Sequence, residues 1–196
     1  MKGEKMDYQD RIGRLQQALI IFFAEREGVF SGAADEMCGR VQNGGKILVF
    51  GNGGSAAQAQ HFAAELVNKF LIDRQPLPCI ALTTDTSALT SIANDLSFDD
   101  VFSRQVEALG MEGDAVLGIT TSGNSANVVK AVRSARECGM MTAVLTGEGG
   151  GKVGSTADYC LDVASSHTPL IQEAHLFLLH LLAEEIERRL GKDVLP

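Results

Sequence analysis

Residues 46–66, KILVFGNGGSAAQAQHFAAEL, decide the fold. Residues 47–50 are a continuous apolar run, which is typical of a parallel strand covered on both faces. The following glycines, 51–54 with Asn52 among them, permit a turn with positive φ values and leave the backbone open to a ligand. Ser55 stands where a helix N-cap is expected, and the residues after it favour a helix. A helix start beside a glycine turn favours an anion such as phosphate, because free N–H groups and the helix dipole both point at it.

Polar side chains on two predicted helices form a possible chemical site. His61 and Glu65 are spaced i, i+4 and therefore share one helix face. Gln172 and His180, on the last predicted helix, are spaced i, i+8 and lie on roughly one face, whereas His175 lies off it. Taken singly, a histidine in an apolar helix is more often a core residue, and Glu65 could be a simple ion-pair partner. Glu with His suits proton transfer, and His-x-x-x-Glu also suits a divalent metal.

Composition limits the classes of protein. A chain of 196 residues with 45% hydrophobic content fits one domain, 1–196. The net charge of −8 argues against a nucleic-acid partner, which would need a basic face. We find no membrane-spanning run and no signal-peptide pattern, and we therefore expect a cytoplasmic location without a membrane partner. The four cysteines are widely spaced and are expected to be buried thiols rather than a disulfide or zinc framework.

Alternating helices and strands indicate an α/β fold. Two helices, 7–27 and 31–43, precede the first strand within an N-terminal part, 1–45. The apolar run 20–23 in the first helix packs either on another subunit or on its own domain. The remaining chain, 46–190, predicts a three-layer αβα sandwich around a mostly parallel, five-stranded, flavodoxin-like sheet. Further strands are predicted at 79–82, 115–119, 142–146 and 159–163, and further helices at 88–94, 98–109, 127–138 and 170–190.

Two nucleotide-binding motifs are only formally matched. Residues 51–56 fit G-x-G-x-x-A, but the acidic residue expected about 20 positions later is missing, because Asp85 is too distant. Residues 147–152 resemble a P-loop, but the spacing between its two glycines is one residue too short. In addition, Val153 stands where Ser or Thr is required. We expect this second segment to be a flexible turn and nucleotide binding to be unlikely.

A hydroxyl-rich loop follows the third predicted strand. Thr120, Thr121 and Ser122 come before a second helix start, which Ser125 is expected to cap. Backbone N–H and side-chain O–H donors can hold a phosphate monoester without lysine or arginine. The alternative is ordinary turn chemistry, for which Ser, Gly and Asn are also common.

Five stretches together resemble a known family: GNGGSAAQAQHFAAEL, SIANDLSFDDVFSRQVEALG, TTSGNSANVVKA, LTGEGGG and IQEAHLFLLH. In this order they are similar to the sugar isomerase (SIS) fold, and most closely to the phosphoheptose isomerases. The resemblance implies conversion of sedoheptulose 7-phosphate to D-glycero-D-manno-heptose 7-phosphate, towards ADP-heptose and the lipopolysaccharide core. It also implies a homotetramer with active sites at subunit interfaces.

The resemblance assigns roles residue by residue. It implies a catalytic pair, Glu65 and His180, in which Glu65 moves a proton between C1 and C2 of an enediol and His180 moves one between O1 and O2. It implies one zinc ion per subunit, bound by His61, Glu65, Gln172 and His180. It implies sugar-phosphate contacts at Asn52, Gly53, Gly54, Ser55, Glu65, Asn94, Asp95, Thr120, Thr121, Ser122, Ser125 and Gln172.

Two other functions remain open at this stage. Some relatives with this fold are non-enzymatic tetramers that bind a replication-initiator protein, and they lack the Glu and His pair. Glu65 and His180 are both present here, which favours the enzyme. Isomerisation of a different sugar phosphate, such as a hexulose phosphate, would use the same chemistry.

Overall fold

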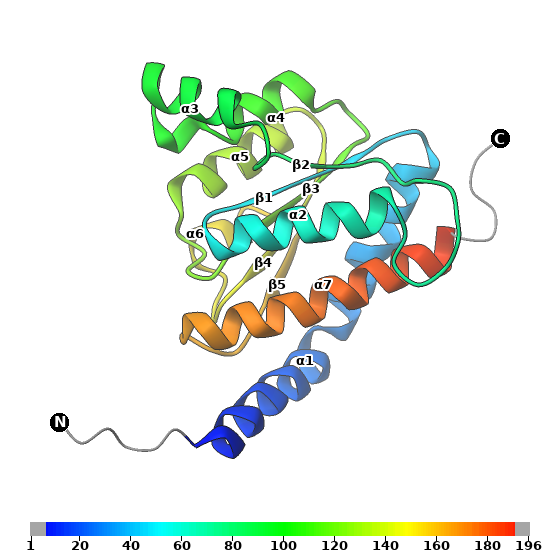
Figure 1. Cartoon of the computed structure of the whole chain (residues 1–196), viewed down its shortest axis with the longest axis vertical. Helices are drawn as coiled ribbons and strands as arrows, with labels where there is room; N and C mark the ends of the chain where they lie inside the picture. Colours follow the sequence, from blue (N-terminus) through cyan, green and yellow to red (C-terminus); the bar gives the residue numbers. More distant parts are fainter. Residues whose placement is uncertain (1–6, 191–196) are drawn as a thin grey trace.

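The computed structural model describes residues 7–190 and contains one five-stranded sheet in the order β2-β1-β3-β4-β5 (Figure 1). Every neighbouring pair is parallel, so the predicted fold class is confirmed and the sheet is parallel throughout. The strands are β1 (Ile47–Gly51), β2 (Cys79–Ala81), β3 (Ala115–Thr120), β4 (Met141–Thr146) and β5 (Tyr159–Asp162). The strands β1, β3 and β4 are buried along their whole length, as expected of strands covered on both faces.

Helices cover both faces of the sheet and complete the three layers (Figure 1). The helices are α1 (Tyr8–Gln42), α2 (Gly54–Val67), α3 (Thr86–Asp95), η1 (Phe98–Asp100), α4 (Ser103–Leu109), α5 (Ala126–Glu137), α6 (Gly151–Gly154) and α7 (Thr168–Leu190). One apolar cluster joins α1, α2 and α7 to the sheet, and a second joins α4 and α5 to its other face. Among residues 7–190 we find no helix with the length and apolar character needed to cross a membrane.

The N-terminal part is one continuous helix, so the prediction of two helices, 7–27 and 31–43, is wrong. α1 runs through Gly28, where an interior glycine costs about 1 kcal/mol relative to alanine. The apolar face of α1 stays in register on α7 and the sheet and buries Phe22 and Phe30 on either side of this glycine. Packing therefore outweighs the weak helix propensity. In the run 20–23, Phe22 is 1% exposed in its own domain, whereas Ile20 is 55% exposed.

Three smaller predictions also change. The N-cap of α2 is Gly53, with φ of +55°, and Ser55 is a buried residue in the first turn. The helix expected at 98–109 is divided into η1 and α4, because the Ser97 side chain caps a separate short turn. The turn expected at 147–152 continues into the short helix α6.

The cysteine prediction holds in part. All four thiols are free, and Cys38 and Cys79 are buried, but Cys138 and Cys160 are only partly so. The single-domain prediction for 1–196 extends beyond the described range, because residues 1–6 and 191–196 lie outside it.

His175 is a core residue of α7 rather than a site residue. Its Nε2 atom lies 3.0 Å from the carbonyl oxygen of Thr146, at the end of β4, and its side chain is fully buried. Burial lowers its pKa from 6.5 to about 4, so the imidazole stays neutral in the native protein.

This burial predicts a loss of stability in mild acid. Between pH 6.5 and pH 4 the unfolded chain binds a proton at His175 that the native chain does not, so the free energy of unfolding falls as the pH falls. The loss reaches about 3 kcal/mol near pH 4. Urea unfolding of the wild type and of His175→Gln across this range measures it. Parallel stability curves for the two proteins would contradict the prediction.

Candidate active site

The two predicted phosphate loops meet because β1 and β3 are neighbours. Gly51, the last residue of β1, pairs with Ile119 of β3, so both strands end at the same edge of the sheet. The chain leaves β1 for α2 on one face and leaves β3 for α5 on the other. Ligands in α/β folds bind at such a point, where the strand order changes direction.

Two asparagines join these loops. The Nδ2 atom of Asn52 donates to Oδ1 of Asn127 at 2.8 Å, and Asn127 donates back to Oδ1 of Asn52 at 2.9 Å. Asn127 also accepts the backbone N–H of Val128, in the first turn of α5. Sequence reasoning missed Asn127, although it follows directly after the loop. The amide pair fixes the distance between the two loops.

The starts of α2 and α5 form a seat for an anion. Gly53 and Ser125 occupy the two N-cap positions, and neither helix start receives a hydrogen bond from a capping side chain. The N–H groups of Ser55 and Ala56 bond within their own turn, and that of Val128 bonds to Asn127. Those of Gly54, Ala126 and Asn127 have no partner among the described residues and are open to a ligand, and both helix dipoles favour a negative charge. Thr120 and Ser125 place their hydroxyl oxygens 3.1 Å apart at this point.

The other loop residues are positioned by close backbone packing. Ser122 accepts the N–H of Asn124 and remains exposed, and the carbonyl of Thr121 accepts the N–H of Gly147. Gly123 has a φ of +65°, and a Cβ atom there would lie 2.2 Å from the carbonyl oxygen of Gly150. Only glycine fits here. The loop after β3 is therefore fixed against the loop after β4.

Helix α7 reaches the first loop through Gln172. A Cβ atom on Gly54 would lie 2.5 Å from Nε2 of Gln172, so this glycine allows the contact. Gln58, on α2, donates to the backbone carbonyl of Gln172 at 2.7 Å, while its own Oε1 atom is buried without a partner. Gln58 was not predicted, because a glutamine within a helix of high propensity carries no distinguishing signal. The contacts place α7 beside α2 (Figure 1).

The predicted His and Glu residues converge farther along the same two helices. The Nε2 atoms of His61 and His180 lie 2.8 Å apart, so one ring donates a proton to the other. Oε1 of Glu65 lies 3.4 Å from Nε2 of His61, and the Glu65 side chain is 21% exposed. A carboxylate and two imidazoles in contact can accept, pass and return protons.

Comparison with known proteins identifies the family. Residues 7–147 match the SIS domain family model. The chain is 54% identical to a phosphoheptose isomerase of Desulfovibrio desulfuricans over 173 residues, 88% of this chain and 82% of that protein. It is 50% identical to the phosphoheptose isomerase of Geobacter sulfurreducens over 93% of this chain and 95% of the other. The chain belongs to the phosphoheptose isomerase family.

A solved structure agrees with this membership. The structure of a phosphoheptose isomerase from Neisseria gonorrhoeae superposes with a TM-score of 0.85 at 44% identity. The match covers 93% of this chain and all of the other. The fold described above is thus that of a phosphoheptose isomerase.

Asn94 and Asp95 make no hydrogen bond to the loop or cluster residues named above within the part of the chain that the structure describes. Both are exposed at the end of α3, and Nδ2 of Asn94 donates to Oδ1 of Asp95 at 2.7 Å. Helix α3 packs against η1, and none of its residues is fully buried. Their role as sugar-phosphate contacts of a phosphoheptose isomerase stays a prediction.

The four predicted zinc ligands are only partly assembled. Within residues 7–190, no group of three or more His, Cys, Asp or Glu side chains is arranged to hold a metal ion. Gln172 makes no hydrogen bond with His61, Glu65 or His180 in the part of the chain that the structure describes. The donor types nevertheless fit zinc, which prefers imidazole nitrogen and carboxylate oxygen. The histidines hydrogen-bond to each other and would have to turn apart to share an ion.

The asparagine pair predicts a binding defect. Replacing Asn127 by alanine removes both bonds to Asn52 and lets the two loops separate. We expect KM for the sugar phosphate to rise about tenfold, as for a loss of roughly 1.4 kcal/mol of binding. Steady-state kinetics and inhibition by inorganic phosphate measure the effect. An unchanged KM with a lowered kcat would contradict this role.

Proposed function

We propose that this phosphoheptose isomerase converts sedoheptulose 7-phosphate to D-glycero-D-manno-heptose 7-phosphate through an enediol. The observation that carries the proposal is the contact of His61 with Glu65 and His180, on α2 and α7. The same chain offers an anion seat at the starts of α2 and α5, where no N-cap side chain makes a capping hydrogen bond. The product serves synthesis of ADP-heptose and the lipopolysaccharide core. The cytoplasmic location expected from the sequence is part of the same proposal.

Each group has a distinct task in this mechanism. The two helix starts and the hydroxyls of Thr120 and Ser125 bind the phosphate and so fix the carbon chain. Glu65 removes the proton from C1 of the ketose and returns it to C2. His180 moves the proton between O1 and O2.

We also propose that zinc binds at His61, Glu65 and His180, with Gln172 as the fourth ligand. The support is the donor set, two imidazole nitrogens and a carboxylate oxygen within contact distance. When bound, zinc would polarise the carbonyl group of the sugar. The proton transfers assigned above belong to the side chains themselves.

Two alternatives remain testable. A binding module for a replication-initiator protein needs no proton-transfer groups, so the contact between His61 and His180 favours the enzyme. Isomerisation of another sugar phosphate would use the same groups. Turnover measured on sedoheptulose 7-phosphate beside shorter ketose phosphates distinguishes these possibilities.

The proton-transfer roles predict inactive variants that still fold. Glu65→Gln and His180→Gln should each lower kcat at least about 100-fold, because each removes a proton acceptor. Glu107→Gln, on the exposed surface of α4, is the matched control and should retain full activity. Deuterium uptake at C1 and C2 in D₂O reports the transfer itself.

The metal proposal predicts zinc in the purified wild type. Zinc content, measured on the same samples and on His61→Ala, should fall in the site variants alone. Active protein free of zinc would overturn the metal proposal.

We further propose a homotetramer with shared active sites. Apolar side chains remain exposed along α1 and α7: Tyr8, Ile12, Ile20, Leu176 and Phe177. The amino-terminal part of α1 extends beyond the sheet (Figure 1). Eleven helix residues, about 16 Å, separate Gly54 from Glu65 along α2. This separation is long for one sugar phosphate and supports a phosphate seat and a Glu-His cluster from different copies.

Shared sites predict complementation between variants that damage different halves of the site. Light scattering should give a tetramer. At a substrate concentration below the KM of the wild type, Glu65→Gln is expected to be inactive and Asn127→Ala to be about tenfold impaired. Mixing the two, followed by subunit exchange, should give more activity than the sum of the separate proteins, because some mixed sites then carry both intact halves. A monomer with full activity would contradict the proposal, and so would exchanged mixtures no more active than that sum.

A further inference from the structure

A buried ion pair lies behind the Glu-His cluster. Glu187 of α7 and Arg74 have side chains that are each 2% exposed, with Oε1 and Nε 3.0 Å apart. The N–H at Nε is poorly aligned for a hydrogen bond, so this contact is mainly ionic. Burial acts to raise the pKa of Glu187, but three backbone N–H groups and Arg74 outweigh it and lower the pKa overall. The carboxylate is therefore charged in the native protein.

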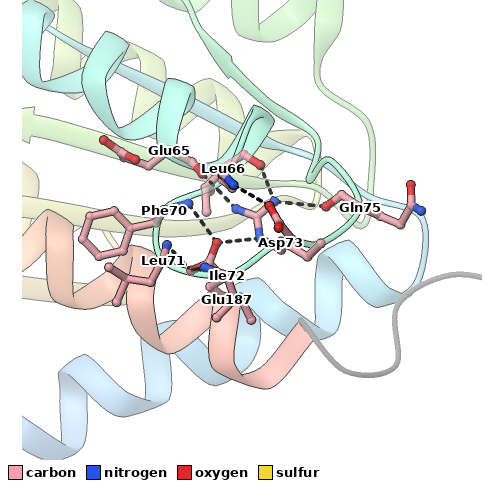
Figure 2. Close-up of polar contacts among 10 residues, drawn as sticks. Glu65, Leu66, Phe70, Leu71, Ile72, Asp73, Gln75 and Glu187 are labelled. Atoms are coloured by element: carbon pink, nitrogen blue, oxygen red, sulfur yellow. Dashed lines mark hydrogen bonds and ion pairs between the residues drawn. The ribbon is translucent and has the colours of Figure 1, made fainter.

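Glu187 holds three consecutive backbone N–H groups (Figure 2). Its Oε1 atom accepts from Phe70 at 2.8 Å, and its Oε2 atom accepts from Leu71 at 2.6 Å and from Ile72 at 3.1 Å. Successive N–H groups that converge on one anion form a concave backbone turn. The carboxylate therefore determines the shape of this turn.

Arg74 attaches the same turn to the end of α2. Its Nη1 atom donates to the carbonyl of Leu66 at 2.8 Å, and its Nη2 atom donates to the carbonyl of Glu65 at 2.8 Å. These carbonyls belong to the last turn of the helix, where intrahelical partners are missing. The pair thus connects α7, the segment 68–75 and the backbone of Glu65.

The segment 68–75 has little else to hold it. It contains no helix or strand, and the side chains of Leu71 and Ile72 are exposed, the former at 62%. Of its three apolar side chains only Phe70 packs against the core, and it is only partly buried, so the segment depends largely on its backbone hydrogen bonds for order. For the backbone of residues 70–72, Glu187 supplies those bonds.

Phe70 connects the segment 68–75 to the Glu-His cluster. Its ring lies almost parallel to the imidazole of His180, with centroids 5.4 Å apart and an interplanar angle of 20°. The other neighbour of that imidazole is His61, which meets it at 60°. Because Glu187 follows His180 by seven residues, both lie on the face of α7 that is turned to α2. The orientation of His180 therefore depends on where Phe70 is held.

We propose that Glu187, Arg74 and Phe70 are positioning residues that orient His180 relative to Glu65. Glu187 fixes the turn that carries Phe70, Phe70 fixes the imidazole plane, and Arg74 fixes the end of α2 that carries Glu65. The proposal rests on the proton-transfer roles assigned above and extends them to residues that do not touch the sugar.

A purely structural role is the alternative, and the chain offers a matched control. Asp114 is also buried, accepts the backbone N–H groups of Lys46 and Met111, and pairs with Nζ of Lys46 at 2.6 Å. It lies directly before β3, at the amino edge of the sheet, opposite the strand ends that carry the phosphate loops. Loss of this pair should affect stability alone.

The experiment compares Glu187→Gln with Asp114→Asn. Glu187→Gln leaves the buried Arg74 unpaired, and Asp114→Asn leaves the partly buried Lys46 unpaired and removes the charge that two backbone N–H groups bind, so we expect both to lower Tm by about 10 °C. Only Glu187→Gln should also lower kcat, by about 10- to 100-fold, with KM changed less than about threefold, because the phosphate seat is intact. Equal kcat values for the two variants at temperatures where both are folded would overturn the proposal.

Phe70→Leu tests the same link without disturbing the ion pair. It keeps an apolar side chain but removes the flat ring over His180, so kcat should fall while Tm changes little. In the double variant with Glu187→Gln, the kcat loss should equal that of the larger single change, since both act through one ring. Fully additive losses would show that Glu187 does not act through Phe70. Should Glu187→Gln fail to fold, an unchanged kcat in Phe70→Leu would by itself overturn the proposal.

A spectroscopic measurement separates this proposal from the assigned activity. The imidazole proton resonances of His180 feel the ring current of Phe70, so they should shift in Phe70→Leu and in Glu187→Gln but not in Asp114→Asn. This readout needs no substrate. Shifted resonances in a protein without isomerase activity would refute the function and leave the positioning intact, whereas unshifted resonances in an active enzyme would refute the positioning alone.

Discussion

The parallel pairing of β1 with β3 is the constraint on which the site depends. It places two strand ends side by side, and the right-handed crossovers then send the following helices to opposite faces of the sheet. Both helix starts remain at one edge, with Asn52 and Asn127 closing the space between them. Without this adjacency, each glycine or hydroxyl loop would be an ordinary turn.

The packing of α2 against α7 is the second requirement, and it acts at three levels along the helices. Near the loops, Gly54 admits Gln172; in the middle, His61 meets His180; at the far end, Glu187 and Arg74 tie the two together. The polar contacts occupy an interface whose remaining residues are apolar core. Reactive side chains are therefore held by a rigid pair of helices rather than by loops.

Several features that depend on neighbouring residues in the sequence were predicted correctly. The apolar runs gave the strands, the glycines after residue 50 gave the turn, and the spacing of His61 and Glu65 gave one site face. Asn127, Gln58 and the Arg74–Glu187 pair were missed because their partners lie 75 to 114 residues away, too far for a local sequence pattern to indicate them. The break expected in α1 failed for the same reason: distant packing on α7 outweighs the propensity of Gly28.

The anion seat has a consequence for turnover. Neither the loop after β1 nor the loop after β3 contains lysine or arginine, so these loops offer only neutral N–H and O–H donors to the phosphate that we propose they bind. Charge-assisted bonds are roughly twice as strong as neutral ones, and a bidentate arginine would hold substrate and product equally tightly. Under the proposed function, a neutral seat would hold the sugar during proton transfer and still let the product dissociate. In a reversible isomerisation, where both sugars carry the same phosphate, we expect this weaker binding to favour fast product release.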